Sequence, residues 1–263
     1  MVSPCGGAWL GVARHDLSEG PLAGTAEAGA LDRALAKDPR CRVTVSLAGV
    51  TRRAKGFAAT VRSGGFGGAE GFAAYLRHEG VDVVINATHP FAAQMSRTVT
   101  DVTGDMALPM VRLLRPPWKQ PRGAEWIGAA DLTDAARLLP EDANAFLALG
   151  QRHLAAFHGH PARLVVRTLE APPDDLLPDA HWIIGPPGKT KAEEARLLAE
   201  TRTTHLVARN SGGSAGWAKI AAAAATGLPA IMVTRPATPR RQVAETIPEV
   251  LGWLDRVKSG RGG

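Results

Sequence analysis

Residues 81–92 read Val81-Asp82-Val83-Val84-Ile85-Asn86-Ala87-Thr88-His89-Pro90-Phe91-Ala92. Their first part is apolar and mostly β-branched, which is the pattern of a strand covered on both faces of a sheet. Small and polar residues follow, and Pro90 suits the first position of a helix, where a backbone donor is not missed. We therefore expect a strand, a short polar turn and a helix, with His89 at the carboxyl end of the strand. Open α/β sheets bind their ligands at that end.

Strands and helices alternate on both sides of this stretch. Strands are expected over 8–13, 42–49, 108–113, 145–149, 163–167, 182–184, 205–208 and 230–233, and helices over 25–37, 69–78, 91–104, 131–139, 190–200, 215–226 and 245–257. Such alternation predicts an α/β fold with parallel sheets and right-handed crossovers. Residues 116–124 contain consecutive prolines, which cannot continue a ladder. They are expected to link two domains, residues 1–118 and 119–263, with an interdomain cleft and a frayed tail from about residue 258.

The composition is ordinary for a globular protein in a reducing compartment. Hydrophobic residues make up 45% of the 263 and charged residues 21%. No apolar run approaches the roughly 18 residues that span a bilayer, and the start does not resemble a signal peptide. Cys5 and Cys41 give neither a disulfide framework nor the spacing of metal ligands. We expect a cytoplasmic protein with no metal site and no membrane partner.

The formal net charge of +6 favours anionic partners. Aromatic residues are only 5% and do not alternate with the basic residues, which weakens the case for a reader of single-stranded nucleic acid. A small polyanion carrying phosphates or several carboxylates fits the charge as well as DNA does. Charge alone does not choose between them.

Three turns of small residues follow successive strands in the first half and are candidates for cofactor binding. They contain Gly24, Thr25 and Glu27; Ser46, Ala48 and Gly49; and Gly64, Gly65, Phe66 and Gly67. Glycines let backbone amides approach a pyrophosphate, and a helix N-terminus adds partial positive charge. Arg52 and Arg53 lie just past the second strand, where an arginine suits a 2′-phosphate, and the strand carries no acid for a free ribose hydroxyl. The pattern favours NADPH over NADH.

Several familiar signatures are missing from the sequence. There is no G-x-G-x-x-G fingerprint, no G-x-S-x-G elbow, no Walker loop and no metal-binding cluster. The only tyrosine, Tyr75, has Glu79 rather than a lysine four residues later. The Tyr/Lys acid pair of short-chain dehydrogenases is therefore not expected.

Cations lie at expected strand ends before and within the second half. Arg115, Arg152 and Arg209 occupy these places, and Lys219 lies about one turn inside the following helix. Most arginines are solvated surface residues, but a cluster facing one cleft would hold carboxylates, because the guanidinium fork matches their geometry. Further donors come from a backbone nest at a helix start, formed by Asn210, Ser211, Gly212 and Gly213.

Taken together, these motifs resemble the precorrin-6A reductase family from about residue 22 to 254. The resemblance is carried by segments 24–28, 46–49, 64–68, 87–92, 115–118 and 210–213, of which Thr-His-Pro-Phe-Ala and Gly-Gly-Phe-Gly-Gly are the specific ones. It implies an NADPH-dependent reductase of cobalamin biosynthesis with two Rossmann-like domains. Its substrate would be a tetrapyrrole macrocycle bearing many carboxylates, reduced by hydride transfer to a ring carbon.

The sequence departs from the family pattern at several positions. The usual opening strand before a Gly-Gly-Thr turn is missing from 14–21, and Ala23 replaces the first glycine; a divergent start or a sequence error would explain both. Asn86 stands where an aspartate is usual, and Gln151-Arg152 reverses the usual order, which puts the role of Arg152 in doubt. Two further changes are Pro187 for a common phenylalanine and Arg209 for a common lysine.

The resemblance also implies roles for the candidate residues. The cofactor phosphates would lie on the 24–27 and 64–67 turns, its 2′-phosphate at Arg52 or Arg53, and its nicotinamide near Thr88, His89, Pro90 and Phe91. The cations of the second half would hold the carboxylates of the macrocycle. His89 is a candidate proton source or orienting donor, with packing or cofactor contact as the competing role.

Two alternatives stay open from the sequence. One is reduction of the cobalt-containing counterpart, cobalt-precorrin-6A, with NADH or NADPH. The other is a non-catalytic module that binds nucleotides or nucleic acid, although the favoured interpretation has no nucleic-acid partner. The default oligomeric state is a monomer.

Overall fold

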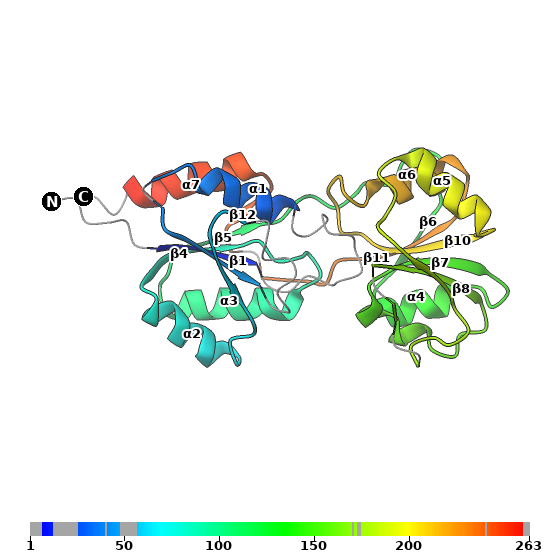
Figure 1. The fold of residues 1–263 in the computed structure, drawn as a ribbon, viewed down its shortest axis with the longest axis horizontal. Coiled ribbons are helices and arrows are strands. Elements are labelled where there is room, and N and C mark those ends of the chain that lie inside the picture. The colour runs from blue at the N-terminus through cyan, green and yellow to red at the C-terminus, as the bar shows by residue number, and fades with distance from the viewer. Residues whose placement is uncertain are drawn as a thin grey trace. The chain divides into compact units, whose positions relative to one another are not determined.

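The computed structural model describes residues 7–12, 26–39, 41–47, 57–169, 171–172, 175–239 and 241–259. The described elements form two units, each built around a six-stranded sheet with helices on both faces (Figure 1). The first unit contains the described residues up to Arg115 and those from Ala237 onward, and the second contains Pro116–Pro236. Within the described residues, no helix is both long and apolar enough to cross a membrane.

In the first unit all strand pairs are parallel, and the sheet order is β3-β2-β1-β4-β5-β12. Helices α1 and α7 cover one face, and α2 and α3 cover the other (Figure 1). The elements are β1 (Gly7–Val12), α1 (Ala26–Leu35), β2 (Val43–Leu47), β3 (Thr60–Ser63), α2 (Ala69–His78), β4 (Val81–Asn86), α3 (Ala93–Asp105), β5 (Met110–Leu113), β12 (Val243–Ala244) and α7 (Ile247–Ser259).

Strand β4 is buried from both sides, which explains its apolar run. Val83 and Ile85 belong to the cluster under α1 and α7, whereas Val84 packs with Phe72 of α2 and Val99 of α3. Because both faces are covered, the residues do not alternate between apolar and polar. The predicted strand is confirmed.

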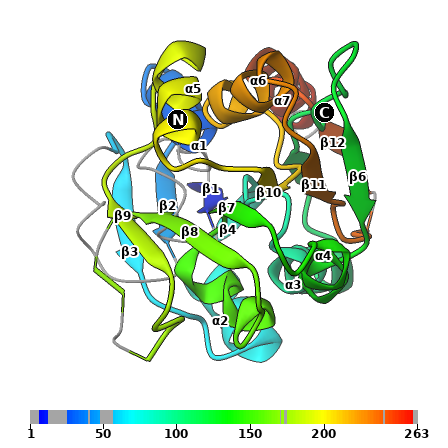
Figure 2. The same ribbon diagram turned by 90° about the vertical axis from the view of Figure 1, so that its right-hand side faces the viewer.

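The second unit repeats the parallel arrangement with the order β6-β11-β10-β7-β8-β9, which can be followed in Figure 2. Helices α5 and α6 lie on one face and α4 on the other (Figure 1). The elements are β6 (Trp126–Ala129), α4 (Leu132–Leu138), β7 (Asn144–Ala148), 3₁₀ turns Gln151–His153 and Ala155–Phe157, β8 (Arg163–Thr168), β9 (His181–Ile184), α5 (Lys191–Glu200), β10 (His205–Arg209), α6 (Trp217–Ala225) and β11 (Ala230–Val233).

The C-terminal segment corrects the expected division of the chain. Residues 237–263 were expected in the second domain, but the structure assigns them to the first unit. The reason is that β12 pairs with β5, where Leu114 N donates to Ala244 O (2.8 Å), and α7 contributes Trp253 and Leu254 to the first core. A two-residue strand has no readable period, and β6 was missed for a similar reason.

Pro90 does not open a helix as expected. Ala92 N donates to His89 O (2.8 Å), which closes a turn over residues 89–92, and α3 begins only at Ala93. Pro90 takes the second place of this turn, where its fixed φ is equally well suited. The turn delays the helix and leaves His89 at its corner.

Candidate functional site

The strand order reverses at one point in each sheet. In the first sheet this point lies between β1 and β4, and in the second it lies between β7 and β10. Chain segments that leave neighbouring strands there run to opposite faces and leave a crevice at the carboxyl ends, where open α/β sheets bind ligands. Residues 87–92 follow β4, residues 149–153 follow β7, and residues 210–213 follow β10. Half of the predicted site residues that the structure describes fall in these segments.

The turn after β4 is held by short-range polar contacts. Asn86 Oδ1 accepts a hydrogen bond from Thr88 N (3.2 Å), and the hydroxyls of Thr88 and Ser96 lie 3.1 Å apart. Thr88 is thereby tied both to the end of β4 and to α3. Thr88 and His89 are also buried, so this segment forms a packed platform at the end of β4.

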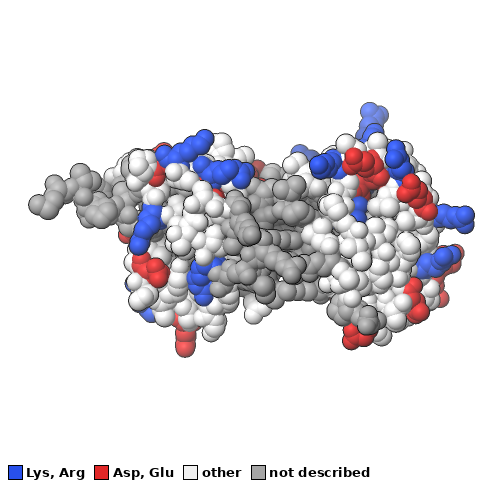
Figure 3. All heavy atoms as spheres, in the orientation of Figure 1, with Lys and Arg blue, Asp and Glu red and all other residues white. Residues whose placement is uncertain are grey.

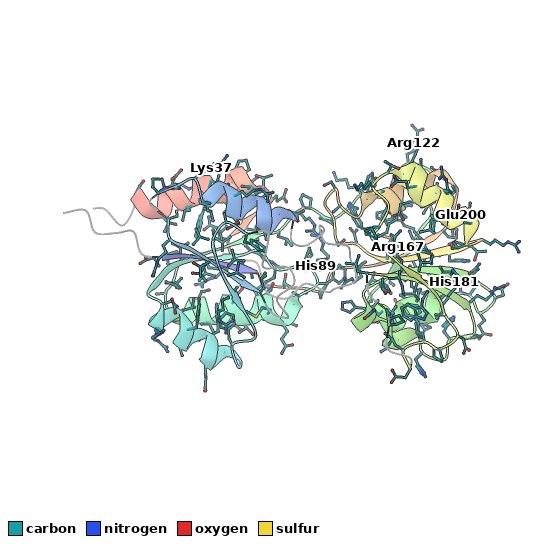
Figure 4. All side chains as sticks on the ribbon, viewed as in Figure 1. Lys37, His89, Arg122, Arg167, His181 and Glu200 are labelled. Atoms are coloured by element: carbon teal, nitrogen blue, oxygen red, sulfur yellow. The ribbon has the colours of Figure 1, made fainter. Side chains whose placement is uncertain are left out.

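The ring of His89 has a defined orientation beyond the end of the first sheet (Figure 4). Its Nδ1 accepts a hydrogen bond from Phe91 N (3.3 Å), and the centroids of the His89 and Phe91 rings are 5.8 Å apart. An imidazole nitrogen that accepts a backbone N–H carries no proton, so the proton of the neutral ring is on Nε2. The turn therefore fixes which nitrogen of His89 can donate.

Arg115 lies in the first unit, as the predicted boundary at residue 118 implies, although it was grouped by role with the cations of the second half. It follows β5 and forms an ion pair with Glu27 of α1 (Nη1 to Oε2, 3.0 Å). These two side chains line a small pocket with Ala87, Thr88, Pro90 and Leu113. The structure thus brings together Glu27, Arg115 and Thr88 at one edge of the first sheet.

The glycine-rich turn after β3 has the backbone that its sequence predicts. Gly64, Gly67 and Gly68 have positive φ values of 112°, 76° and 98°, which glycine adopts without strain. Among the described residues, no heavy atom beyond the chain neighbours lies within 4 Å of a Cβ built at any of the three. A ligand could approach this backbone closely.

Arg62 is the residue of this region that sequence reasoning missed. It precedes the turn on β3, and its Nη1 donates to Gly64 O (2.7 Å) and Ser46 Oγ (3.3 Å) while Nη2 donates to Gly65 O (2.8 Å). Register gives the signal that could have found it, because Ser46 and Arg62 are direct neighbours on β2 and β3. Arg62 thereby joins two of the three predicted turns.

One side of the Arg62 guanidinium is covered by aromatic rings. Its Cζ lies 4.0 Å from the ring centre of Phe66 and 5.1 Å from that of Tyr75. The two rings are 5.2 Å apart, too close together to sandwich the group between them. They therefore orient the guanidinium from one side and stabilise its charge through cation–π interactions.

In the second unit, the segment after β10 is closed by hydrogen bonds to Trp118 and is not an open set of donors. Trp118 N donates to Asn210 Oδ1 (2.7 Å), Asn210 Nδ2 donates to Trp118 O (3.1 Å), and Trp118 Nε1 donates to Gly213 O (2.6 Å). A Cβ at Gly212 would lie 2.0 Å from Pro116 O, so only glycine fits. Asn210 thus fixes the start of the second unit.

The cations of the second unit are more buried than expected. Arg209 is 2% exposed, and its Nη1 lies 2.8 Å from His153 Nε2. Lys219 of α6 is 7% exposed, and Ser211, two residues after Arg209, is also buried. Arg235, which follows β11, was missed and donates to Asn210 O (2.9 Å) and Ser211 O (2.8 Å). The rule that selected the ends of the other strands would have selected Arg235 as well.

Several predicted site residues lie outside the described part of the chain. These are Gly24, Thr25, Ala48, Gly49, Arg52 and Arg53, together with the side chain of Arg152. Their proposed contacts stay predictions, as does the interdomain cleft. Among the described residues, no group of three or more His, Cys, Asp or Glu side chains could hold a metal ion.

A cavity of about 630 Å³ in the second unit lies away from these segments. It is lined by residues that begin β7, β8 and β9, including Asn144, Arg163 and His181 (Figure 4). This is the amino edge of the sheet, which is opposite to the edge that binds ligands in such folds. Among the described residues drawn in Figure 3, acidic and basic side chains are interspersed, a pattern that does not favour nucleic-acid binding.

Comparison with known proteins identifies the family. The family model described as precorrin-6x reductase CbiJ/CobK matches residues 22–255. This chain belongs to the precorrin-6x reductase family. It is therefore an oxidoreductase of cobalamin biosynthesis that acts on a ring C=C bond, and its family implies a reduced nicotinamide cofactor.

Individual relatives of this reductase cover nearly the whole chain. The precorrin-6A reductase of Rhodococcus erythropolis is 41% identical over 89% of this chain and 94% of its own. That of Rhodobacter capsulatus is 39% identical over the same shares. A solved structure titled CobK precorrin-6A reductase superposes with a TM-score of 0.83 at 34% identity, covering 95% of this chain and 97% of that one. The α/β fold with parallel sheets and the predicted family are confirmed.

The described residues of this reductase fit a nicotinamide dinucleotide. At Gly64, Gly65, Gly67 and Gly68, no side chain of the described residues crowds the backbone where a pyrophosphate would lie. The Thr88–His89 segment lies at the switch point of the same sheet. Both features belong to one edge of the first unit.

Proposed function

We propose that this protein reduces precorrin-6A with NADPH, by hydride transfer to one ring carbon and proton addition to its neighbour. The observation that carries the proposal is the order of the first sheet, 3-2-1-4-5-6 in chain order, with the glycine turn and the His89 turn at one edge. This order is that of the Rossmann fold, which binds dinucleotides at this edge.

The first unit would hold the cofactor. The backbone of Gly64, Gly65 and Gly67 lines the surface proposed for its phosphates, and Arg62 keeps this turn in shape. The uncovered side of the Arg62 guanidinium would face the cofactor. Arg52 or Arg53 would bind the 2′-phosphate. When bound, the reduced nicotinamide supplies the hydride.

His89 would hold the proton that completes the reduction. The turn keeps Nδ1 on the backbone of Phe91, so Nε2 is the atom proposed to donate. Thr88 and Ser96 keep the turn from moving, which supports a fixed distance to the substrate. The protein thus supplies position and a proton.

The second unit would bind the carboxylates of the macrocycle. Arg209 and Lys219 bring positive charge to the carboxyl end of β10 and the start of α6. Because Arg209 is buried against His153, we propose that it acts with His153 as a pair, and that Ser211 and Gly213 add polar contacts. Arg152 is proposed as a further cation.

The central test is NADPH oxidation with precorrin-6A, followed by the absorbance of the pigment. We expect oxidation to depend on both compounds and the spectrum to change with it. A parallel reaction with cobalt-precorrin-6A shows which form is preferred. NADPH that stays reduced in the presence of the folded enzyme and precorrin-6A would contradict the proposal.

A double variant tests the choice of cofactor. Replacing Arg52 and Arg53 with Ala should raise the KM for NADPH about 10- to 100-fold, since a charge-assisted hydrogen bond is worth about 1.5–3 kcal/mol. The KM for NADH should change little, because NADH has no 2′-phosphate. An unchanged KM for NADPH would assign the 2′-phosphate elsewhere.

A further inference from the structure

A charged group is buried in the first unit without a described counter-charge. Arg112 on β5 is 3% exposed, and its Nη1 donates to the hydroxyl of Thr238. Its Nε and Nη2 are closed off from solvent and have no hydrogen-bond partner among the described residues. Burial lowers the pKa of this guanidinium, and no carboxylate of the described residues forms an ion pair with it.

A second donor lies beside it on the neighbouring strand. Asn86 of β4 is in direct register with Arg112, and residues opposite each other in a sheet project from the same face. Asn86 is fully buried, and because its Oδ1 accepts from Thr88 N, its Nδ2 is the remaining donor. Within the described part of the chain, this Nδ2 has no hydrogen-bond partner either.

The shared face is the one that packs against α2 and α3. Val84 and Met110, two residues earlier in the two strands, both belong to the cluster with Phe72 and Val99. The nearest acid on this face of β4 is Asp82, four residues and roughly 13 Å away along the strand. Asn86 Nδ2 and the Arg112 guanidinium therefore lie on one buried face, and among the described residues no acceptor is bonded to Nδ2, Nε or Nη2.

Such an arrangement is costly unless an acceptor fills it, and most costly if the charge stays uncompensated. A water molecule could accept hydrogen bonds but would leave the charge. The carboxylates of the proposed substrate are assigned to the second unit, so they would not supply this acceptor in the core of the first. We propose that Asn86 and Arg112 bind a small monovalent anion, chloride in the cell, inside the first unit.

The proposed anion would lie directly behind the His89 turn. Its contact with Nδ2 would fix the carboxamide of Asn86, whose Oδ1 holds Thr88 N. Occupancy would therefore stabilise the platform on which His89 is placed. The anion would bind whether or not the protein reduces precorrin-6A, because the site lies within the core of the first unit.

The test measures thermal unfolding of the full chain in sodium chloride or bromide, with gluconate, too large for the site, keeping the ionic strength constant. A bound halide should raise the midpoint by about 3–5 °C for each tenfold increase in its concentration above saturation. Asn86→Asp places a fixed carboxylate opposite Arg112. It should raise the midpoint in gluconate and abolish the halide dependence.

Gln94→Glu is the matched control, because it adds the same charge at an exposed position of α3 in the same unit. It should keep the halide dependence of the wild type. A wild type without halide dependence, or equal dependence in wild type and Asn86→Asp, would overturn the proposal. Should Asn86→Asp not fold, wild-type crystals in bromide decide: an anomalous peak between Asn86 Nδ2 and Arg112 Nη2 supports the site, and a water or an empty position there overturns it.

Discussion

A single hydrogen bond from the backbone of Phe91 determines which ring nitrogen of His89 carries the proton. Because Nδ1 accepts from Phe91 N, a substitution can separate the turn from the proton. Asparagine places an oxygen near the position of Nδ1 and keeps the turn, whereas alanine loses both functions. We expect His89→Asn and His89→Ala to lower kcat alike, by about 10²- to 10⁴-fold, if His89 is the general acid.

The readout is kcat for NADPH oxidation together with the unfolding midpoint. His89→Asn should keep the midpoint of the wild type, since the turn is preserved. If His89→Asn retained full kcat and only His89→Ala lost it, the ring would serve the turn and not the proton transfer.

Arg62 offers a second test at a single side chain. Its guanidinium joins Ser46 to the carbonyls of Gly64 and Gly65. Arg62→Met keeps part of the apolar stem over Phe66 but removes these bonds and the charge. We expect the Kd for NADPH, measured by fluorescence titration, to rise about 10- to 100-fold. This range corresponds to the loss of a hydrogen bond from a charged group, which is worth about 1.5–3 kcal/mol.

Arg77→Met is the control for this experiment. Arg77 is exposed on α2 in the same unit, and its substitution removes an equal charge. It should leave the Kd close to that of the wild type. Equal Kd values for Arg62→Met and wild type would exclude Arg62 from the cofactor site.

Helix α7 has a carboxylate in its first turn, Glu249, whose protonation state affects the capping of the helix. Glu249 accepts from Glu245 N (2.9 Å) and from the hydroxyl of Thr246 (2.9 Å), and the first of these bonds contributes most to lowering its pKa. A depressed pKa means that the capping stabilises the fold above the unfolded value, about 4.3, and is lost as the pH falls through the folded value.

Glu249→Gln should therefore lower the unfolding midpoint at pH 7, and the difference from wild type should shrink toward pH 3. Circular dichroism melts at both pH values measure this. Glu245→Gln, exposed in the same segment, should show no such convergence, because its backbone makes the bond. A constant difference at both pH values would argue against the capping role.

The elements differ in how far the sequence predicts them. Strand β4 was predicted because burial on both faces leaves a continuous apolar run, and the glycine turn because positive φ requires glycine. Arg62 was missed because its role depends on register with β2, which no local pattern reveals. The buried state of Arg209 was missed because an arginine at a strand end looks the same in sequence whether it is solvated or buried.

The two units make different demands on the chain. Pro116–Pro236 is a continuous segment with its own sheet and its own core around Phe146 and Ile220. We expect this fragment, expressed alone, to fold with a cooperative melt. A chain truncated after Pro236 lacks β12 and α7, so its first unit should lose the apolar cover that Val250, Trp253 and Leu254 provide.

Proteolysis with mass spectrometry of the truncated chain checks both statements. Cleavage should be confined to residues before Arg115, while the second unit resists. Uniform cleavage across both units would show that the second sheet depends on the first for its stability.

The return of the C-terminal segment also sets a timetable for synthesis. On the ribosome, β5 of the nascent first sheet has no partner on one side until β12 emerges. The apolar core beside α1 stays uncovered until α7 emerges. The intervening 121-residue insert, Pro116–Pro236, is complete well before then and can fold ahead of it. The half that begins first is thus finished last, and a stalled or prematurely ended message would leave it exposed to chaperones and proteases.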